Sequence, residues 1–513
     1  MRQPIRATTL QDSAPGSARG RLHNACVVII VVLFCILALV SANSLLPQPD
    51  EAVYANPGYN MVYNGHTGTT LYELRGYMPL SMMQHTYWQF PLYFVGTALW
   101  FRILGFGLFQ VRSFSILFAL LTLGSWYWIV RRLTGSATAG LFALGLTSLD
   151  FFFVLGASTG RMDMMCCGLG AAALASYLLL RERSFAQAFF WSHLFATLSI
   201  MTHAVGVLYW LALVFLILTR DRRLISLRLL LAGAAPALVG MALWGLFILQ
   251  DPHGFREQMR ESLNLQNGYW DMRGLSRNSL LRSLQLEWRH RYQAPFGLGP
   301  GVGIAQRLKA VILAAYAIPI LGVLFSRRFR RYPGLGSLSV MTLIAVFYLG
   351  LVSPSKFAYY LPHVTTFMAA SLGAFLCSLA DSIPRKRWLA GAAVVLLAGL
   401  QLAGILYRIR QDPYHRSYLP VVELVRKNTT SRSIIMATGE IWFGIEHDRY
   451  MIYDPALGEL SGTVPDLVVW AKTERELQGK HKISDPALFQ HVQRLLDTGR
   501  LIYQDEYYQV YLR

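Results

Sequence analysis

The chain has 513 residues, of which 54% are hydrophobic and only 15% are charged, and its mean hydropathy is +0.38. A soluble protein usually carries about a quarter charged residues, so this composition excludes a pair of water-soluble domains and indicates a polytopic membrane protein. The net charge of +19 lies in the apolar part, because the first 407 residues hold 33 basic and 14 acidic residues while the remainder is balanced. A nucleic-acid-binding patch would lie on a soluble module instead, so no nucleic-acid partner is expected.

Eleven apolar runs have about the length of a membrane-spanning helix, which needs about 20 residues. They lie at 25–46, 108–130, 137–157, 162–180, 185–201, 203–219, 229–249, 308–326, 337–353, 358–380 and 389–407. Only Thr202 and His203 separate the fifth run from the sixth. The sequence is therefore compatible with a hairpin at this point or with one bent element.

The distribution of basic residues predicts the orientation of the chain. Alternating the spans from a cytoplasmic N-terminus places 19 Lys and Arg in the inner connections and very few in the short outer ones, as the positive-inside rule requires. The outer segment 251–307 holds eight arginines, but long loops translocate largely regardless of charge. Residues 1–24 are then cytoplasmic, and the run 25–46, too long for a signal-peptide core, is predicted to be a retained anchor.

Three regions outside the lipid are predicted on the outer side, namely the loops 47–90 and 251–307 and the tail 408–513. Within the tail, the apolar patterns predict strands at 434–437 and 466–470, helices at 418–428 and 486–498, and a hairpin at 501–512. The expected fold is a mainly α, polytopic membrane protein with about 11 transmembrane helices in residues 25–407. A small α/β domain, residues 408–513, follows on the periplasmic or extracellular side.

Carboxylates are scarce in the membrane part, and those present lie near its outer face on this topology. Asp50 and Glu51 follow the first span, and Asp163 opens the fourth. A charged side chain at the membrane centre costs about 2.5–3.5 kcal/mol on insertion scales, so it normally faces a cavity or a partner. These three residues are candidate catalytic groups, and a helix N-terminal cap is the alternative for Asp50 and Glu51.

A fourth carboxylate, Asp150, lies inside the third span, about two turns from its outer end. For this residue we favour a structural role, as an ion pair or hydrogen bond with Arg112 or Arg161.

Cations at the outer boundary are candidate phosphate contacts, because negative charge grows on a phosphate as it leaves. Arg161, Lys356 and His203 are the candidates. The alternatives are that Lys356 snorkels to the interface and that His203 is a buried histidine with satisfied hydrogen bonds. Tyr54 and Tyr360 are candidate substrate contacts at the outer mouth, with an interfacial aromatic belt as the alternative.

A divalent metal ion is left open by the sequence. Asp50, Glu51 and Asp163, with a histidine such as His66 or His85, offer the oxygen and nitrogen ligands that such an ion takes. The spacing does not demand a metal, so the sequence establishes no cofactor.

Four stretches resemble, in order, motifs of the GT-C superfamily of membrane glycosyltransferases. The resemblance is to the neighbourhood of glycosyltransferase family 39, which includes protein O-mannosyltransferases and lipid A aminoarabinose transferases. The stretches are 48–55, 90–113, 161–164 and 355–362. Two positions depart from the family pattern: Gln89-Phe90-Pro91 stands where His-Pro-Pro is common, and Thr202-His203-Ala204 stands where Thr-Lys-Gly is common.

The resemblance implies an enzyme that transfers a hexose or pentose from a polyprenyl-phosphate donor to a glycolipid, polysaccharide or protein on the outer face. By position, Asp50 would be the general base, Glu51 its neighbour, Asp163 the second acid of the site, and Lys356 a phosphate contact. We expect an inverting reaction and a location in a bacterial inner membrane.

A transporter or flippase of lipid-linked sugars is the alternative function. It would share the apolar bulk and the basic donors, but it would need polar residues through the depth of several spans and usually an internal repeat. The charged residues gather at the outer end and the sequence shows no repeat, which favours the enzyme. A membrane scaffold with a partner-binding tail would leave Asp50 and Asp163 unexplained.

Overall fold

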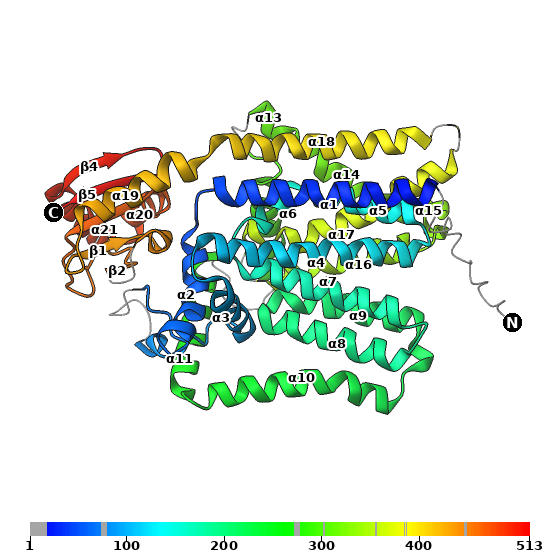
Figure 1. Ribbon diagram of the computed structural model, residues 1–513, viewed down its shortest axis with the longest axis horizontal. Coiled ribbons are helices and arrows are strands. Elements are labelled where there is room, and N and C mark those ends of the chain that lie inside the picture. The colour runs from blue at the N-terminus through cyan, green and yellow to red at the C-terminus, as the bar shows by residue number, and fades with distance from the viewer. Residues whose placement is uncertain are drawn as a thin grey trace.

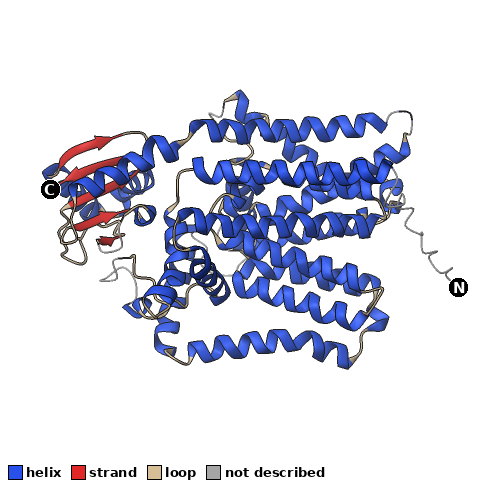
Figure 2. Cartoon of the chain, viewed as in Figure 1, coloured by secondary structure: helices blue, strands red, loops and turns tan. Residues whose placement is uncertain are grey.

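The computed structural model is a bundle of long helices with a small α/β unit at one end (Figure 1, Figure 2). It describes residues 18–72, 80–270, 277–300, 303–353, 356–383, 385, 387–445 and 449–513. The bundle and the α/β unit follow the two compositions of the sequence, since the apolar part forms helices and the charge-balanced tail forms the sheet.

Each apolar run expected to span the membrane coincides with helical structure, because a helix satisfies every backbone hydrogen bond within one segment. The helices are α1 (Ala18–Ser44), α4 (Leu108–Thr134), α5 (Ala137–Ser148) with α6 (Phe151–Ala157), α7 (Met162–Leu180), α8 (Phe185–Thr202), α9 (Val207–Arg220), α10 (Leu227–Ile248), α14 (Lys309–Phe325), α16 (Leu335–Leu351), α17 (Pro362–Ser382) and α18 (Arg387–Gln411).

The helices differ in how well they meet the requirements for crossing a membrane. Among the described residues, six are long and apolar enough, and α5 with α6, bent by 65°, would form a seventh as a broken span. Helices α9, α14, α16 and α3 (Pro91–Leu104), which lies outside the expected spans, are apolar but shorter. The chain is thus a multi-pass membrane protein, and the total of about 11 transmembrane helices remains a prediction.

The ambiguous fifth and sixth runs form two separate helices. Helix α8 ends at Thr202, His203 is extended with φ −158° and ψ 141°, and the 3-10 turn η2 (Ala204–Gly206) leads into α9. Helix α9 lies beside α8 (Figure 1). Of the two alternatives for this region, the structure contains the hairpin.

Helices α7 and α17 form the centre of the bundle. In their apolar windows 83% and 89% of the residues are buried, against 11% for α10, which lies at the edge of the bundle (Figure 1). Side chains in the first turns of α7 and α17 are therefore surrounded by protein, whereas α10 exposes a row of leucines as a lipid-facing helix does.

The two loops predicted on the outer side are partly helical. The loop 47–90 contains α2 (Pro49–Tyr63) and the 3-10 turn η1 (Leu80–Met83), and the loop 251–307 contains α11 (Pro252–Trp270), α12 (Arg277–Glu287), the π-helix η4 (Trp288–Gln293) and α13 (Ile304–Arg307). Helices α2 and α11 lie at the end of the bundle that carries the C-terminal unit (Figure 1).

The C-terminal unit is a five-stranded sheet in the order β2-β1-β3-β5-β4. Its strands are β1 (Ile434–Ala437), β2 (Tyr450–Ile452), β3 (Leu467–Ala471), β4 (Arg500–Gln504) and β5 (Tyr508–Leu512), and its helices are α19 (Leu419–Asn428), α20 (Lys472–Ser484) and α21 (Pro486–Thr498). Strands β1, β2 and β3 are parallel, and β4 and β5 form an antiparallel hairpin. The small C-terminal α/β unit is confirmed, although its sequence did not indicate β2 or α20.

The carboxyl ends of the parallel strands face α2 and the loop that follows it. A Cβ on Gly439, just after β1, would lie 3.1 Å from the carbonyl oxygen of Pro49. The Tyr453 amide, just after β2, donates to the carbonyl of Leu71 at 2.7 Å, and the Tyr453 ring stacks on Tyr72 at 5.4 Å. This contact places the sheet edge beside the first turn of α2, where Asp50 lies.

Glu440, in this same edge, is buried and gives the C-terminal unit a pH-dependent stability. Burial, and then the charge of Glu474, raise the pKa of Glu440 from 4.5 to about 8. Between these values the folded chain holds a proton that the unfolded chain has lost, so stability falls as the pH rises from 4.5 to 8. We expect the melting temperature in detergent to fall between pH 6 and pH 8.5, and this fall to be smaller in Glu440→Gln.

Glu423→Gln is the matched control, because Glu423 is an exposed carboxylate on α19 of the same unit. A pH dependence that is equal in all three proteins would contradict the assignment to Glu440.

Candidate functional site

The first turn of α2 is tied to three other parts of the bundle through Glu51. Its carboxylate accepts from Nε and Nη2 of Arg112 on α4, at 2.9 and 2.8 Å, and both side chains are fully buried. Arg112 Nη1 also donates to the carbonyls of Ala42 and Leu45 at the end of α1. Glu51 and Arg112 thereby fix where α2 starts, so Glu51 acts on the position of its neighbour Asp50.

The same carboxylate holds the turn before α7. The Gly160 amide donates to Glu51 Oε1 at 2.6 Å. A Cβ at position 160 would clash with the Val111 side chain, so only glycine allows the backbone to approach this closely. Glu51 thus brings the start of α2, with Asp50, against the start of α7, with Arg161 and Asp163.

Replacing Glu51 by alanine is expected to lower the free energy of unfolding by about 3–5 kcal/mol, because it leaves the Arg112 guanidinium buried without its counter-charge. The melting temperature in detergent, or an SDS titration, measures this loss. Glu182→Ala is the control, since Glu182 is exposed and its contact with Arg132 is 3.8 Å long; exposed pairs contribute about 0–1 kcal/mol. Equal losses in the two variants would refute the structural role of Glu51.

Arg161 joins the two other candidate carboxylates. Its Nε donates to Asp163 Oδ2 at 3.0 Å, and its Nη1 forms an ion pair with Asp50 Oδ2. Arg161 and Asp163 are each 3% exposed, whereas the Asp50 side chain is 48% exposed. The structure therefore brings Asp50 and Asp163 to one guanidinium, and of these two carboxylates Asp50 is the exposed one.

Two aromatic rings hold the Arg161 guanidinium in place. Its Cζ lies 4.4 Å from the ring centre of Tyr359 and 5.2 Å from that of Tyr54, distances at which the ring quadrupole attracts a cation. Tyr54 also packs against Trp88, with ring centres 5.7 Å apart. Tyr54, expected as a substrate contact, thus orients Arg161, and Tyr359 does the same without having been expected.

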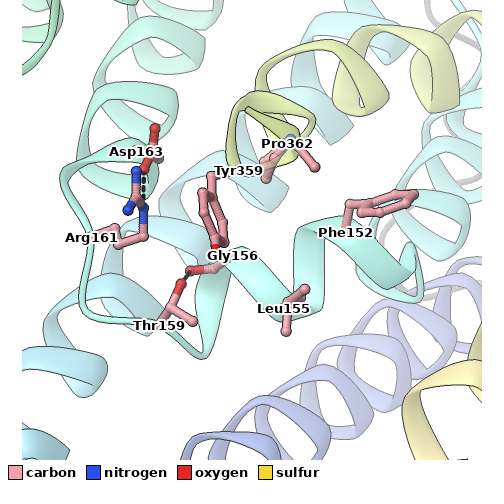
Figure 3. A pocket seen from close by; sticks show the side chains of 9 residues that line it. Phe152, Leu155, Gly156, Thr159, Arg161, Asp163, Tyr359 and Pro362 are labelled. Atoms are coloured by element: carbon pink, nitrogen blue, oxygen red, sulfur yellow. Dashed lines mark hydrogen bonds and ion pairs between the residues drawn. The ribbon is translucent and has the colours of Figure 1, made fainter. Parts of the chain in front are cut away.

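A cavity of about 70 Å³ opens beside Arg161 and Asp163 (Figure 3). Except for Thr159, its other walls are apolar and aromatic and come from α6, the 3-10 turn η5 (Ala358–Tyr360) and the start of α17: Phe152, Leu155, Gly156, Ala358, Tyr359 and Pro362. The cavity therefore has an apolar body and one charged end, as suits a ligand with a hydrocarbon part and an anionic group.

The inner oxygen of Asp163 faces a histidine on α17. Asp163 Oδ1 lies 3.8 Å from Nε2 of His363, and both residues are buried. His363 was not among the predicted site residues, although it follows directly on the stretch 355–362 near the start of an apolar run.

Lys356 is enclosed by protein and does not face an open cavity. It is fully buried and donates to the carbonyls of Leu349, Gly350 and Ser353 at the end of α16, at 3.2, 2.9 and 2.7 Å. Its Nζ is also 3.6 Å from Glu287. Burial lowers the pKa of Lys356 to about 8, and Glu287 opposes this shift. In this structure Lys356 caps a helix and neither snorkels nor faces the cavity.

Glu287 is shared with Arg291, one of the eight arginines of the loop 251–307. Arg291 Nη1 donates to Glu287 Oε2 at 2.6 Å, and the guanidinium lies 5.5 Å from the ring centre of Tyr360. Their spacing of four residues on a helical segment was the signal for this pair. Tyr360 is itself buried.

His203 lies next to Tyr360, with ring centres 5.2 Å apart. Its Nδ1 accepts from the Val205 amide at 3.1 Å. His203 thereby turns the backbone between α8 and α9, as the alternative of a hydrogen-bonded histidine describes.

Asp150 is a structural residue, but its expected partners were wrong. It accepts from Tyr316 at 2.8 Å, Gln401 at 2.9 Å, Thr365 at 3.0 Å and the Phe153 amide at 2.9 Å. These neutral donors come from α14, α18, α17 and the first turn of α6. They hold the break between α5 and α6, whereas Arg112 and Arg161 bind other carboxylates.

The described residues contain no group of three or more His, Cys, Asp or Glu side chains placed to hold a metal ion. The candidate set of Asp50, Asp163 and His85 is therefore not assembled. Asp50 and Asp163 both contact Arg161, while His85 packs its ring against Tyr87, with centres 5.7 Å apart.

Comparison with known proteins gives a consistent picture of the fold. A family model described as dolichyl-phosphate-mannose-protein mannosyltransferase matches residues 89–245. An uncharacterized protein of Aquifex aeolicus (strain VF5) is 29% identical over 131 residues, which is 25% of this chain and 24% of that protein. The chain thus matches about a quarter of the length of this curated relative.

Two solved structures are similar over most of the chain. ArnT from Cupriavidus metallidurans bound to undecaprenyl phosphate has a TM-score of 0.58 and 16% identity, covering 96% of this chain and 98% of that one. The archaeal oligosaccharyltransferase AglB from Archaeoglobus fulgidus, in complex with an inhibitory peptide and a dolichol-phosphate, has a TM-score of 0.52 and 13% identity, covering 88% and 70%.

Both of these structures have the GT-C architecture. The chain therefore has the fold that its resemblance to the GT-C superfamily implied.

Proposed function

We propose that this protein is an integral-membrane glycosyltransferase that moves a sugar from a polyprenyl-phosphate donor to an acceptor on the outer face of the membrane. The observation that carries the proposal is the pairing of Asp50 and Asp163 through Arg161 beside a cavity with apolar walls. The family model and the lipid phosphates named for the two solved structures support the same class of donor.

The cavity supplies the donor site in this proposal. The prenyl chain enters from the lipid and packs against Phe152, Leu155 and Pro362, where removing apolar surface from water favours binding. Its phosphate then meets Arg161, whose planar guanidinium suits phosphate oxygens. The rings of Tyr54 and Tyr359 pack against that guanidinium and hold its orientation.

Asp50 is the general base of the proposed transfer. It takes the proton of the acceptor hydroxyl, the acceptor oxygen forms a bond to the anomeric carbon, and the bond from that carbon to the phosphate oxygen breaks. The electron pair leaves with the polyprenyl phosphate, whose second negative charge is stabilised by Arg161. Attack opposite to the leaving group inverts the anomeric centre.

The ion pair between Asp50 and Arg161 implies an order in which the two substrates bind. Without donor, the Asp50 carboxylate is engaged in an ion pair with Arg161. A phosphate that binds Arg161 competes with Asp50 for the guanidinium and releases the carboxylate for the acceptor. Donor would thus bind before acceptor, and the base would become active only when the leaving group is in place.

The location follows the charge distribution of the sequence. We infer a bacterial inner membrane, with the N-terminus in the cytoplasm and the C-terminal unit in the periplasm. The site then lies at the outer ends of α7 and α17, next to the C-terminal sheet edge that contacts α2.

The decisive experiment uses purified protein in liposomes that contain a polyprenyl-phosphate sugar. Release of free polyprenyl phosphate, stimulated by an envelope extract as acceptor source, is the expected result. Translocation of intact donor across the bilayer without any release would instead establish a flippase and refute the enzyme. Addition of a chelator to the same assay tests the metal requirement that the sequence left open.

A further inference from the structure

His363 lies directly beneath the candidate site, on the first turn of α17. Asp163 binds Arg161 through Oδ2 only, and its Oδ1 lies 3.8 Å from His363 Nε2. Neither Oδ1 nor Nε2 has another hydrogen-bond partner among the described residues, and both side chains are buried. Each of these two atoms therefore has the other as its facing polar group.

The other side of the ring determines where the imidazole proton lies. His363 Nδ1 is 3.1 Å from the Tyr209 hydroxyl, which in turn is 3.1 Å from Cys167 Sγ. If Tyr209 donates to Nδ1, the ring proton lies on Nε2. If Tyr209 donates to the thiol, Nδ1 must itself donate to Tyr209. An unprotonated Nε2 would then face the carboxylate with its lone pair, which is unfavourable, so Nε2 must carry a proton as well. In each favourable arrangement, Nε2 therefore carries an N–H that points toward Asp163.

The charges of the site explain why such a donor is useful there. Asp50 and Asp163 contribute two negative charges and Arg161 only one positive charge, so the three residues together repel an incoming phosphate. A hydrogen bond or a positive charge from His363 compensates Asp163 from the inner side. Asp163 then contacts Arg161 with one oxygen only, and the remaining nitrogens of the guanidinium stay available for Asp50 and the cavity.

We propose that His363 is a positioning residue, which holds Asp163 so that Arg161 is presented to the phosphate of the donor. This inference rests on the proposed function and deepens it. Without His363, Asp163 Oδ1 is left unpaired in the core and competes for a second guanidinium N–H. That contact draws Arg161 inward, away from Asp50 and from the cavity that takes the donor.

The test compares variants in the assay for release of polyprenyl phosphate. His363→Leu should lower kcat/KM for the donor about 10- to 100-fold, as expected for losing a hydrogen bond to a charged group. His363→Gln should retain more activity, because an amide can still donate to Asp163. His193→Gln is the control, since His193 lies on α8 and bonds to the carbonyl of Phe189 in its own helix.

A double-mutant cycle separates positioning from a general role in packing. In an Asp163→Asn background, His363→Leu should reduce activity by less than about 3-fold further, because the interaction that it removes is already gone. If the activity losses caused by Asp163→Asn and by His363→Leu multiply in full in the double variant, the proposal is overturned. A His363→Leu enzyme with wild-type kcat/KM would overturn it as well. A wild-type protein that releases no polyprenyl phosphate would instead refute the proposed function itself.

A spectroscopic measurement checks the contact without relying on activity. In protein labelled with ¹⁵N-histidine, Asp163→Asn should shift the side-chain nitrogens of His363 and leave those of His193 unchanged. Unchanged His363 resonances would show that the two side chains do not interact and would overturn the proposal even if His363→Leu fails to fold.

Discussion

Replacing Asp50 by asparagine is expected to lower the rate of sugar transfer about 100- to 10,000-fold, the range that general-base assistance supplies. Asparagine has the same size and can still accept a hydrogen bond from Arg161, but it cannot take a proton from the acceptor. Among the three carboxylates of the site only Asp50 is half-exposed, so no neighbour can replace it as the base. The measurement is the release of polyprenyl phosphate with acceptor present.

Donor binding should survive this substitution. The neutral asparagine amide no longer competes with the phosphate for Arg161 as a charge, so the affinity for polyprenyl phosphate alone should be unchanged or higher. Asp497→Asn, an exposed change on α21 of the C-terminal unit, is the control and should leave the rate unchanged. Near-normal turnover in Asp50→Asn would show that another group accepts the proton.

The helices could be predicted from sequence because the membrane imposes a strong local constraint. A run of about 20 apolar residues has few alternatives to a helix in lipid, so each expected run falls on helical structure. A break in the helix inside such a run depends on side chains from distant parts of the sequence. The bend before α6 is held by Tyr316, Gln401 and Thr365, which lie far from Asp150 in the chain.

The members of the site could be predicted, but not how they pair. Scarcity and position singled out Asp50, Asp163 and Arg161, which the structure brings together. Arg112 was expected near Asp150 but pairs with Glu51, 61 residues away in sequence. Which carboxylate meets which arginine depends on how α2 docks on α4, and no periodicity in the sequence reports that docking.

The same limit explains the residues that the sequence misassigned or missed. Lys356 is an isolated cation at an outer boundary, a pattern that fits a phosphate contact as well as a helix cap. The structure shows three carbonyls around it, and these belong to the backbone, which carries no sequence signal. His363 was missed because its partner Asp163 is 200 positions earlier, at the start of another span.

Replacing Arg161 by lysine is expected to lower kcat/KM for the donor about 100- to 1000-fold, as removal of a preorganised charge donor does. The guanidinium contacts Asp163 through Nε and Asp50 through Nη1 and lies against the ring of Tyr359. A lysine ammonium is a compact point charge that cannot span both carboxylates and also offer a planar pair of donors to phosphate.

The pattern of losses should distinguish Arg161→Lys from Asp50→Asn. Arg161→Lys should weaken binding of polyprenyl phosphate alone as well as turnover, because the proposed mechanism has Arg161 contact the phosphate in both the bound donor and the product. Arg256→Lys, an exposed arginine on α11 at the same end of the bundle, is the control and should change neither. If Arg161→Lys binds polyprenyl phosphate as the wild type does, the phosphate must be held by another cation. Arg161 would then serve only to align Asp50 with Asp163.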